Sequence, residues 1–263
     1  MYQEFLETTY PNQQATIAAY TLAGEQVWLK RAAKRNSRLA YAPLTWLATL
    51  MRVEALRPVP NLGGEQSIRT EAARLRALAD AGIRVPPLLA THPQALLLAD
   101  AGAPGAPAPT LLEELKRAPS EQEIDALLAL ATDALIDVHR KGAYLSEAFG
   151  RNVLVTQGRV VFIDFETDPG EVLSPVNCMV RDWYCFIFSL YGRFHKKPLQ
   201  RECLAPALRD ALSHEREDVR QRFKAALPSL LRLKCLPFRY FGSDGKKIHV
   251  TLAALAELND HLP

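Results

Sequence analysis

Residues 150–166 read GRNVLVTQGRVVFIDFE and decide how the chain is interpreted. Two short apolar runs flank the turn signal Gln157-Gly158, a pattern that predicts a β-hairpin. Asn152 stands before the first predicted strand and Asp164 ends the second. Both side chains offer the hard oxygen ligands that Mg²⁺ prefers. The hairpin therefore predicts a cation site at one of its ends.

The bulk composition is that of an ordinary globular protein. The chain has 263 residues, of which 48% are hydrophobic, enough for a buried core in one large domain or two small lobes. The net charge of +3 is too small to indicate nucleic acid as a partner. No two of the four cysteines are closely spaced, which argues against a cysteine-bound metal or a disulfide framework. We expect buried or half-buried thiols in a reducing compartment.

The sequence also predicts where the protein resides. Its start lacks a basic region followed by an apolar run, so no signal peptide is predicted. The longest apolar stretch, within residues 40–56, is interrupted by Pro43 and Arg52 and is too short to span a bilayer. A cytoplasmic protein is expected.

The first hundred residues predict a strand-rich lobe. We expect strands at 15–23 and 26–31 around a hairpin turn signal at Gly24-Glu25, a helix over 68–81 that Gly82 ends, and further strands after Pro87 and at 95–99. A basic cluster and a second helical pattern lie between them, at residues 31–38 and 42–54. The polar stretch 8–14 is expected to be a loop.

The rest of the chain predicts a helical lobe. Residues 101–109 are rich in Gly, Pro and Ala and are expected to connect the lobes. Ser120 is a predicted helix cap for a buried helix that reaches about Lys141, and the hairpin follows. Helical patterns continue over three further ranges, 179–190, 205–233 and 248–262. The expected fold class is α+β, with an N-terminal lobe at 1–100 and a helical lobe at 110–263.

Lys30 and Glu71 are the predicted ligand-orienting pair. Lys30 follows apolar residues on a strand, where pleat alternation places it on the opposite face from Arg31. Glu71 lies in the predicted helix 68–81 and, if it faces Lys30, would hold the ammonium group in place. The alternatives are a solvated edge-strand lysine and a surface glutamate chosen for helix propensity.

Several other polar residues have competing interpretations. Asp164 is a metal ligand or a turn carboxylate, and Asn152 is its partner or a strand-initiating residue. Glu166 and Asp168 either assist this pair or are loop charges, and the second interpretation is preferred. Asp182 is expected to be structural, accepting backbone N–H groups at the start of a helix or supporting a loop from beneath. His139 is expected to be a packing histidine.

These parts, in this order, resemble the protein-kinase-like superfamily over residues 15–195. The chain looks most similar to small bacterial RIO-type kinases and lipopolysaccharide core kinases, including 3-deoxy-manno-octulosonic acid kinases. The resemblance implies a two-lobed fold in which Lys30 holds nucleotide phosphates, Glu71 orients Lys30, and Asn152 with Asp164 holds Mg²⁺.

Two departures from the family pattern are visible. The phosphate-covering G-x-G-x-x-G loop is absent from the sequence before Lys30, and the stretch 8–14 stands in its place. The family pattern also has an Asp as catalytic base five residues before the metal-binding Asn, where this chain has Glu147. Glu147 keeps the carboxylate on a longer side chain, so it is either a base in an altered site or a residue without chemistry.

Two functions remain open. The first is an ATP- and Mg²⁺-dependent kinase, with Glu147 and Asp164 as catalytic residues and a lipopolysaccharide-core sugar or a protein Ser/Thr as acceptor. The basic run 30–38 and the apolar pattern at 46–51 allow peripheral contact with the inner membrane; the alternative is a solvated loop and a packed helix. The second function is a pseudokinase that binds nucleotide or regulates a partner.

Overall fold

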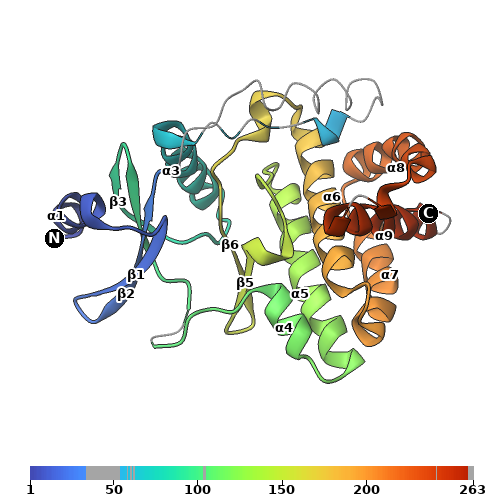
Figure 1. The fold of residues 1–263 in the computed structure, drawn as a ribbon, viewed down its shortest axis with the longest axis horizontal. Helices are drawn as coiled ribbons and strands as arrows, with labels where there is room; N and C mark the ends of the chain where they lie inside the picture. The colour runs from blue at the N-terminus through green and yellow to red at the C-terminus, as the bar shows by residue number, and fades with distance from the viewer. Residues whose placement is uncertain are drawn as a thin grey trace.

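The chain folds into a small sheet-bearing part and a larger helical part (Figure 1). A computed structural model describes residues 1–33, 54–57, 59, 61, 63–102, 105–240 and 242–259. The α+β class is therefore confirmed. The predicted helix at 42–54, except its last residue, the apolar pattern at 46–51 and most of the basic cluster at 31–38 lie outside the described residues.

The main sheet consists of antiparallel strands in the order β1-β2-β4-β3. Its strands are β1 (Ile17–Leu22), β2 (Glu25–Arg31), β3 (Leu88–His92) and β4 (Ala95–Ala99). Ala23 and Gly24 form the turn between β1 and β2, with φ of 53° and 85°. Two consecutive residues with positive φ are what a type I′ hairpin turn requires. The predicted strands are confirmed, and the turn lies one residue earlier than expected.

Helices cover the two faces of this sheet differently. Helix α1 (Tyr2–Thr9) packs its buried Leu6 against Val27 and Leu29 on one face. Helix α3 (Gly64–Asp80) packs against Leu96 and Leu98 on the other. The prediction of a loop at 8–14 is wrong in part, because Thr8 and Thr9 complete α1 and a 3₁₀ turn follows. Strand β4 is buried on both faces, which accounts for its unbroken apolar sequence.

The end of α3 agrees with the sequence pattern. Gly82 has φ of 70°, and Ile83 N donates to Leu78 O at 2.9 Å, as in a Schellman motif. The chain then passes through β3 and β4 to residues 101–109, which lead to α4 (Leu111–Arg117). Helix α4 was not predicted, although Thr110 and Glu113 form a capping box at its start.

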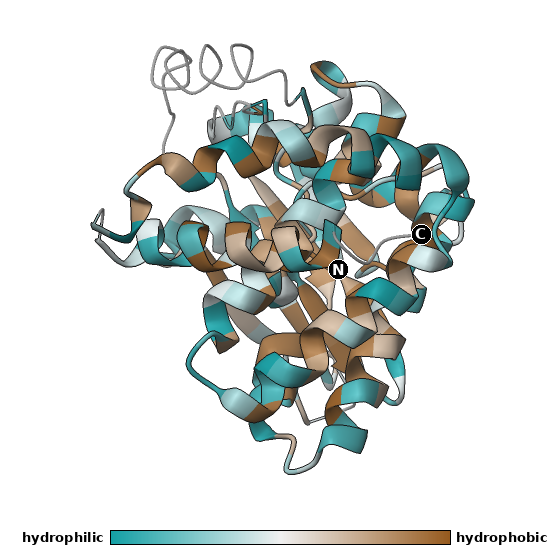
Figure 2. Cartoon of the chain, turned by 90° about the vertical axis from the view of Figure 1, so that its right-hand side faces the viewer, coloured by the Kyte–Doolittle hydropathy of each residue, from teal (hydrophilic) through white to brown (hydrophobic). Residues whose placement is uncertain are grey.

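Long helices build most of the second part. They are α5 (Glu121–Arg140), α6 (Pro175–Phe194), α7 (Pro198–Ser213), α8 (Glu217–Leu231) and α9 (Gly242–Asn259). Short 3₁₀ turns are η1 (Tyr10–Asn12), η3 (Glu54–Leu56), η4 (Gly150–Asn152), η5 (Pro169–Glu171), η6 (Arg232–Cys235) and η7 (Phe238–Tyr240). Figure 2 shows hydrophobic segments turned inward and hydrophilic ones outward on these helices. None of the described helices has the length and apolarity needed to cross a bilayer.

Two predictions for the helical part need correction. A continuous helix over 205–233 is wrong, because α7 ends at Ser213 and α8 begins at Glu217. The break occurs where the side chain of Glu215 turns into the core, and a new N-terminus then forms at Glu217 with acidic residues in its first turn. The cysteines are free as expected, but Cys235 is exposed rather than buried.

The predicted hairpin is confirmed. Its strands are β5 (Val153–Thr156) and β6 (Arg159–Phe162), joined by a turn at Gln157 and Gly158. Both turn residues have positive φ, 49° and 67°. Beyond the last strand pair, Ile163 N donates to Asn152 O at 3.0 Å. This extra bond places Asn152 beside the end of β6, next to Asp164.

The core of the helical part provides a stability prediction. Phe223 is fully buried, and its ring lies 4.9 Å from that of Tyr184. Replacement by Ala should lower the free energy of unfolding by about 3–5 kcal/mol, since it removes a large buried ring and leaves a cavity. Urea denaturation would measure the loss. Tyr240→Ala is the matched control, because that ring is 72% exposed and its removal should change little; equal losses would contradict this account of the core.

Candidate active site

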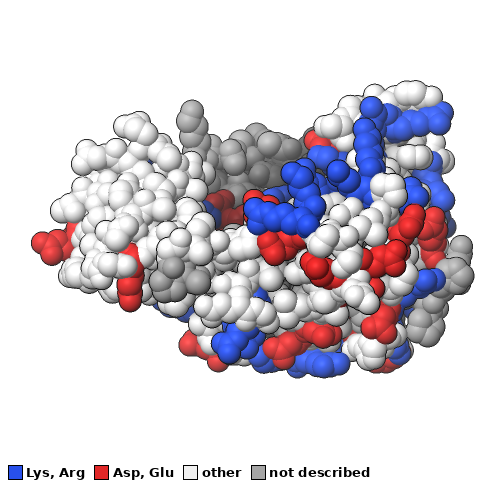
Figure 3. Space-filling view, turned by 90° about the horizontal axis from the view of Figure 1, so that it is seen from below, with Lys and Arg blue, Asp and Glu red and all other residues white. Residues whose placement is uncertain are grey.

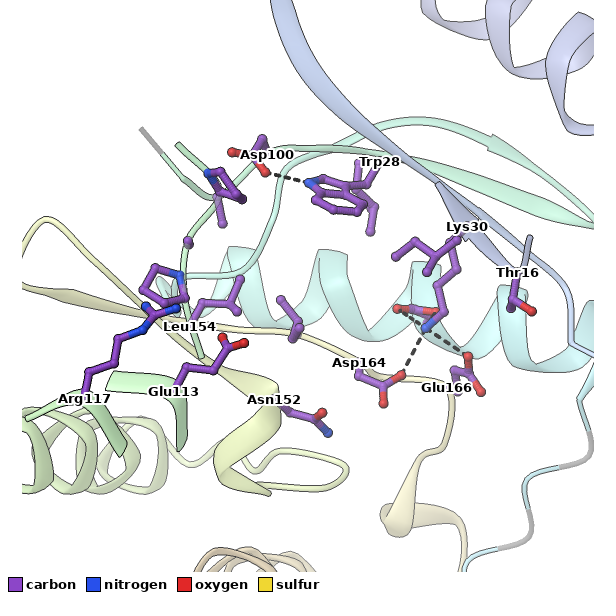
Figure 4. Close-up of a pocket in the computed structure, with 18 residues that line it drawn as sticks. Thr16, Trp28, Lys30, Asp100, Glu113, Arg117, Asn152, Leu154, Asp164 and Glu166 are labelled. Carbon is purple, nitrogen blue, oxygen red and sulfur yellow. Dashed lines mark hydrogen bonds and ion pairs between the residues drawn. The ribbon is translucent and has the colours of Figure 1, made fainter. Parts of the chain in front are cut away.

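A cavity of about 670 Å³ lies between the sheet and the helical part. Figure 4 shows its polar groups divided between two ends. Lys30, Asp164 and Glu166 lie together at one end, and Trp28 and Asp100 lie at the other. The wall between them includes apolar side chains from both parts of the chain.

Lys30 lies at the centre of the charged end. It is 8% exposed and belongs to β2, whose pleat directs Val27 and Leu29 toward α1 and leaves Lys30 facing α3. Its Nζ lies 2.8 Å from Glu71 Oε2. The predicted Lys30–Glu71 pair is therefore present, and neither residue has the solvated position of the alternative interpretation, since Glu71 is 2% exposed.

Two further carboxylates reach the same ammonium group. Lys30 Nζ lies 3.0 Å from Asp164 Oδ1 and 2.9 Å from Glu166 Oε1. The interpretation of Glu166 as a loop charge is wrong, because it is a third partner of Lys30 and also accepts a hydrogen bond from Asn61 at 2.9 Å. Three carboxylates around one ammonium leave an excess of negative charge that a divalent cation would offset.

Electrostatics keep Lys30 charged. Burial acts to lower the pKa of Lys30, but the carboxylates of Glu71, Asp164 and Glu166 outweigh it and raise the pKa above the ordinary value. Burial raises the pKa of the Glu71 carboxyl, opposed by the Lys30 ammonium. The ammonium group is therefore a permanent cation, which suits it to contact anionic ligand groups.

Asp164 and Asn152 stand side by side at this end. Asp164 has φ of 72°, a left-handed conformation that Asp and Asn tolerate better than most residues. Asn152 Nδ2 donates to Glu147 O at 3.1 Å, which directs its Oδ1 away from the loop, and Figure 4 shows the carboxamide turned toward Asp164. Oδ1 accepts no hydrogen bond from the described residues, so it is free to bind a ligand.

The oxygen donors fit Mg²⁺ as an open site rather than a closed cage. Within the described ranges, no three His, Cys, Asp or Glu side chains are grouped to hold a metal ion. Mg²⁺ is commonly held by one or two carboxylates together with phosphate oxygens and water. Asp164 Oδ2 and Asn152 Oδ1 meet that requirement from the protein side.

Glu147 lies apart from the pocket. Its carboxylate does not line the cavity and approaches Arg151 at 3.6 Å. Burial raises the pKa of Glu147, while Arg181 opposes the rise. Its backbone carbonyl accepts the hydrogen bond from Asn152. The carboxylates of Asp164 and Glu166 add to the rise in the pKa of Glu147, so its side chain lies within electrostatic range of the charged end of the cavity.

Buried polar contacts hold the loop that carries Glu147. Asp182 Oδ2 accepts a hydrogen bond from Leu145 N at 2.7 Å, and Ser146 Oγ donates to Thr167 O. Asp182 therefore supports the loop from beneath, one of the two structural roles expected. It does not lie at a helix start, because α6 begins two turns earlier with Ser174 as its cap.

His139 connects Asp182 to the core of the helical part. It is fully buried, as expected for a packing histidine. Its Nδ1 lies 2.6 Å from Glu215 Oε2, and its Nε2 lies 3.5 Å from Asp182 Oδ2. Burial acts to lower the pKa of His139, but hydrogen bonds to Asp182 and Glu215 raise it above the ordinary value. Glu215 was not predicted, because no sequence pattern relates it to His139, which lies 76 residues earlier in the chain.

The opposite end of the cavity carries an aromatic group. Trp28 lines it, and its Nε1 donates to Asp100 Oδ1 at 2.5 Å. Asp100 also accepts hydrogen bonds from Gln26 at 3.3 Å and Gly102 N at 2.8 Å, so the indole is fixed in place. Trp28 was not predicted, although its position two residues before Lys30 on a strand implies a shared face.

The segment expected to replace a glycine-rich loop is placed elsewhere. No residue of the stretch 8–14 lines the cavity, whereas Thr16 and Ile17 do. Gln13 is buried and donates to Leu29 O at 3.1 Å, and Arg31 donates to Gln13 O. Arg31 therefore faces away from Lys30, as predicted, and its guanidinium holds the segment before β1.

Comparison with known proteins found no matching family model and no matching curated protein. The function must be inferred from the site itself.

The buried histidine generates a pH prediction. A raised folded pKa means that His139 contributes stability that is fully present below its unfolded pKa of about 6.5 and is lost as pH rises through the folded pKa. The free energy of unfolding, measured in urea between about pH 6 and pH 9, should fall with pH. In His139→Gln this fall should be smaller, because Gln does not titrate. Parallel curves for the two proteins would contradict the assignment.

Proposed function

We propose that this chain is an ATP- and Mg²⁺-dependent phosphotransferase that acts on a hydroxyl acceptor. The observation that carries the proposal is the position of Lys30, whose ammonium contacts Glu71 on one side and Asp164 on the other within one cavity. The ammonium group of Lys30, beside the carboxylate of Asp164 and the carboxamide of Asn152, is suited to bind the phosphates of a nucleotide. The resemblance to kinase-like proteins in the order of these residues supports the same proposal.

Each residue has a proposed role. Lys30 would bind phosphate oxygens, and Glu71 would keep the ammonium oriented and charged. Asn152 and Asp164 would hold Mg²⁺, which when bound supplies positive charge at the phosphates. The buried carboxylate of Asp182, which holds the loop that precedes Asn152, would keep these groups in fixed positions. Catalysis would consist mainly of positioning and charge neutralisation.

The end of the cavity that carries Trp28 suits the base of the nucleotide. Leu154 and Ile163 line the cavity from the hairpin, and Leu98 and Trp28 line it from the sheet. Apolar and aromatic surfaces on opposite walls favour a flat heterocycle between them. Because Asp100 is occupied by three donors, Trp28 would act as a rigid stacking surface.

The proposed acceptor is a hydroxyl group. A lipopolysaccharide-core sugar and a protein Ser or Thr both carry the required hydroxyl group. Glu147 would orient or deprotonate it, and its raised pKa brings the carboxyl nearer to the range in which general bases work. Glu147 is not among the residues that line the cavity, which favours a second candidate, a pseudokinase that binds nucleotide without efficient transfer.

Nucleotide binding can be tested by thermal unfolding. ATP with Mg²⁺ should raise the melting temperature of the native chain by mass action, by an amount equivalent to about 2.7 kcal/mol at a hundredfold excess over Kd. In Asp164→Asn the Mg²⁺-dependent part of this rise should disappear, while the left-handed backbone is retained because Asn tolerates it. No rise for the native chain at millimolar ATP would refute the proposal.

The same preparations separate the two candidates. Labelled ATP and candidate acceptors should yield phosphorylated product with the native chain, and Glu147→Gln should lower the rate while leaving the thermal shift intact. A thermal shift without measurable transfer, unchanged in Glu147→Gln, would favour the pseudokinase.

Trp28 provides a separate prediction for the base. Trp28→Ala should weaken ATP binding by roughly 5- to 150-fold, since stacking on an aromatic side chain contributes about 1–3 kcal/mol per base. Binding of inorganic triphosphate should be unchanged, and Trp28→Phe should retain most of the affinity for ATP. Titration calorimetry would measure all three. Equal weakening for ATP and triphosphate would place the base elsewhere.

A further inference from the structure

The segment between α8 and α9 forms a distinctive surface on the helical part. It includes η6 and η7 and runs from Arg232 to Tyr240. The name "C-terminal basic surface" is used here for four cations and two apolar side chains: Arg232, Lys234, Arg239, Lys246, Leu236 and Tyr240. All six are exposed. In Figure 3 most Lys and Arg side chains lie over the helical part, where Asp and Glu side chains also lie, and the sheet part is nearly free of Lys and Arg in that view.

Charge is unevenly distributed along the chain. Residues 219–256 contain eight Lys or Arg and a single acidic residue, Asp244, although the net charge of the whole chain is only +3. The rest of the chain is therefore net negative. Arg220, Arg222 and Lys247 of this range are paired with carboxylates, so the excess that can attract an anionic partner comes from the four cations of the C-terminal basic surface.

The four cations of this surface differ from their neighbours in having no carboxylate partner among the described residues. Arg216 pairs with Asp218 at 2.7 Å, and Lys247 pairs with Asp244 at 2.8 Å. No such ion pair involves Arg232, Lys234, Arg239 or Lys246; the guanidinium of Arg239 instead lies 4.7 Å from the centre of the Tyr240 ring. Their charge is therefore available to an external partner.

Apolar side chains stand among these cations. Leu236 is 42% exposed and Tyr240 is 72% exposed, and the only other large hydrophobic side chains exposed in the described part are Met1 and Ile17. Leu233 and Phe238 of the same segment pack against the core. These inner contacts fix the segment to the protein and leave Leu236 and Tyr240 directed outward.

We propose that the C-terminal basic surface docks on an anionic lipid membrane. Cations without partners match the negative surface of such a membrane, and each contributes about fivefold to the partition. An aliphatic side chain and a tyrosine among the cations suit the boundary between headgroups and acyl chains. Nucleic acid would use the cations and stack on Tyr240, but it offers no apolar environment for Leu236. The inference does not depend on the proposed phosphotransfer.

Vesicle flotation with the full chain tests the proposal. The protein should float with vesicles of equal parts phosphatidylcholine and phosphatidylglycerol, with a partition about 600-fold above that for phosphatidylcholine alone, since each of the four cations contributes about fivefold. Lys234→Glu with Arg239→Glu should abolish the preference, and Leu236→Ser with Tyr240→Ser should weaken binding at the same charge. Arg76→Glu with Arg159→Glu is the matched control, because these exposed cations lie far along the chain from the surface.

Folding and nucleotide binding are monitored in parallel. Each variant should keep the native melting temperature and thermal response to ATP, so a loss of flotation reports the surface itself. Equal flotation with neutral vesicles, or equal loss in the matched control, would overturn the proposal. Binding of a single-stranded oligonucleotide that is lost in Lys234→Glu with Arg239→Glu, without flotation on anionic vesicles, would overturn it in favour of a nucleic-acid surface.

Discussion

The ammonium group of Lys30 is the contact on which the rest of the site depends. It joins three segments that are distant in sequence: strand β2, helix α3 through Glu71, and the end of β6 through Asp164. A buried cation is tolerated only where anionic partners replace the water it has lost. The two parts of the chain are therefore connected at the cavity by an ion network, and the geometry of the cavity depends on it.

The same network explains why a divalent cation together with an anionic phosphate group would fit the site. Lys30 alone cannot neutralise Glu71, Asp164 and Glu166, and a divalent cation beside Asp164 would remove the imbalance. The ammonium group of Lys30 would then contact phosphate oxygens in place of Asp164, while its contact with Glu71 is kept. The left-handed backbone of Asp164 fits this interpretation, because strained conformations are often retained at functional positions.

Much of this arrangement could be predicted from local sequence patterns. The hairpin around Gln157-Gly158 and the helix stop at Gly82 follow from turn signals, which depend on neighbours in the chain, whereas the pairing of Lys30 with Glu71 was expected from the family resemblance. Contacts between segments that are distant in the chain produce no comparable local pattern in the sequence. The third carboxylate, Glu166, resembled a loop charge, and the contact of Glu215 with His139 spans 76 residues. Helix α1 was not predicted because its sequence is short and polar. It buries one residue, Leu6, so no helical spacing of apolar residues can be recognised.

The central claim is that Lys30, Asn152 and Asp164 converge on one bound nucleotide and its metal ion. A crystal structure with a non-hydrolysable ATP analogue and Mn²⁺ tests this most directly, because Mn²⁺ is identified by its anomalous scattering. The account predicts the ion bound by Asn152 Oδ1 and Asp164 at roughly the 2.1 Å typical of such oxygen ligands, with Lys30 Nζ on a phosphate oxygen and the base beside Trp28. A nucleotide bound outside this cavity, or an ion that contacts neither Asn152 nor Asp164, would contradict it.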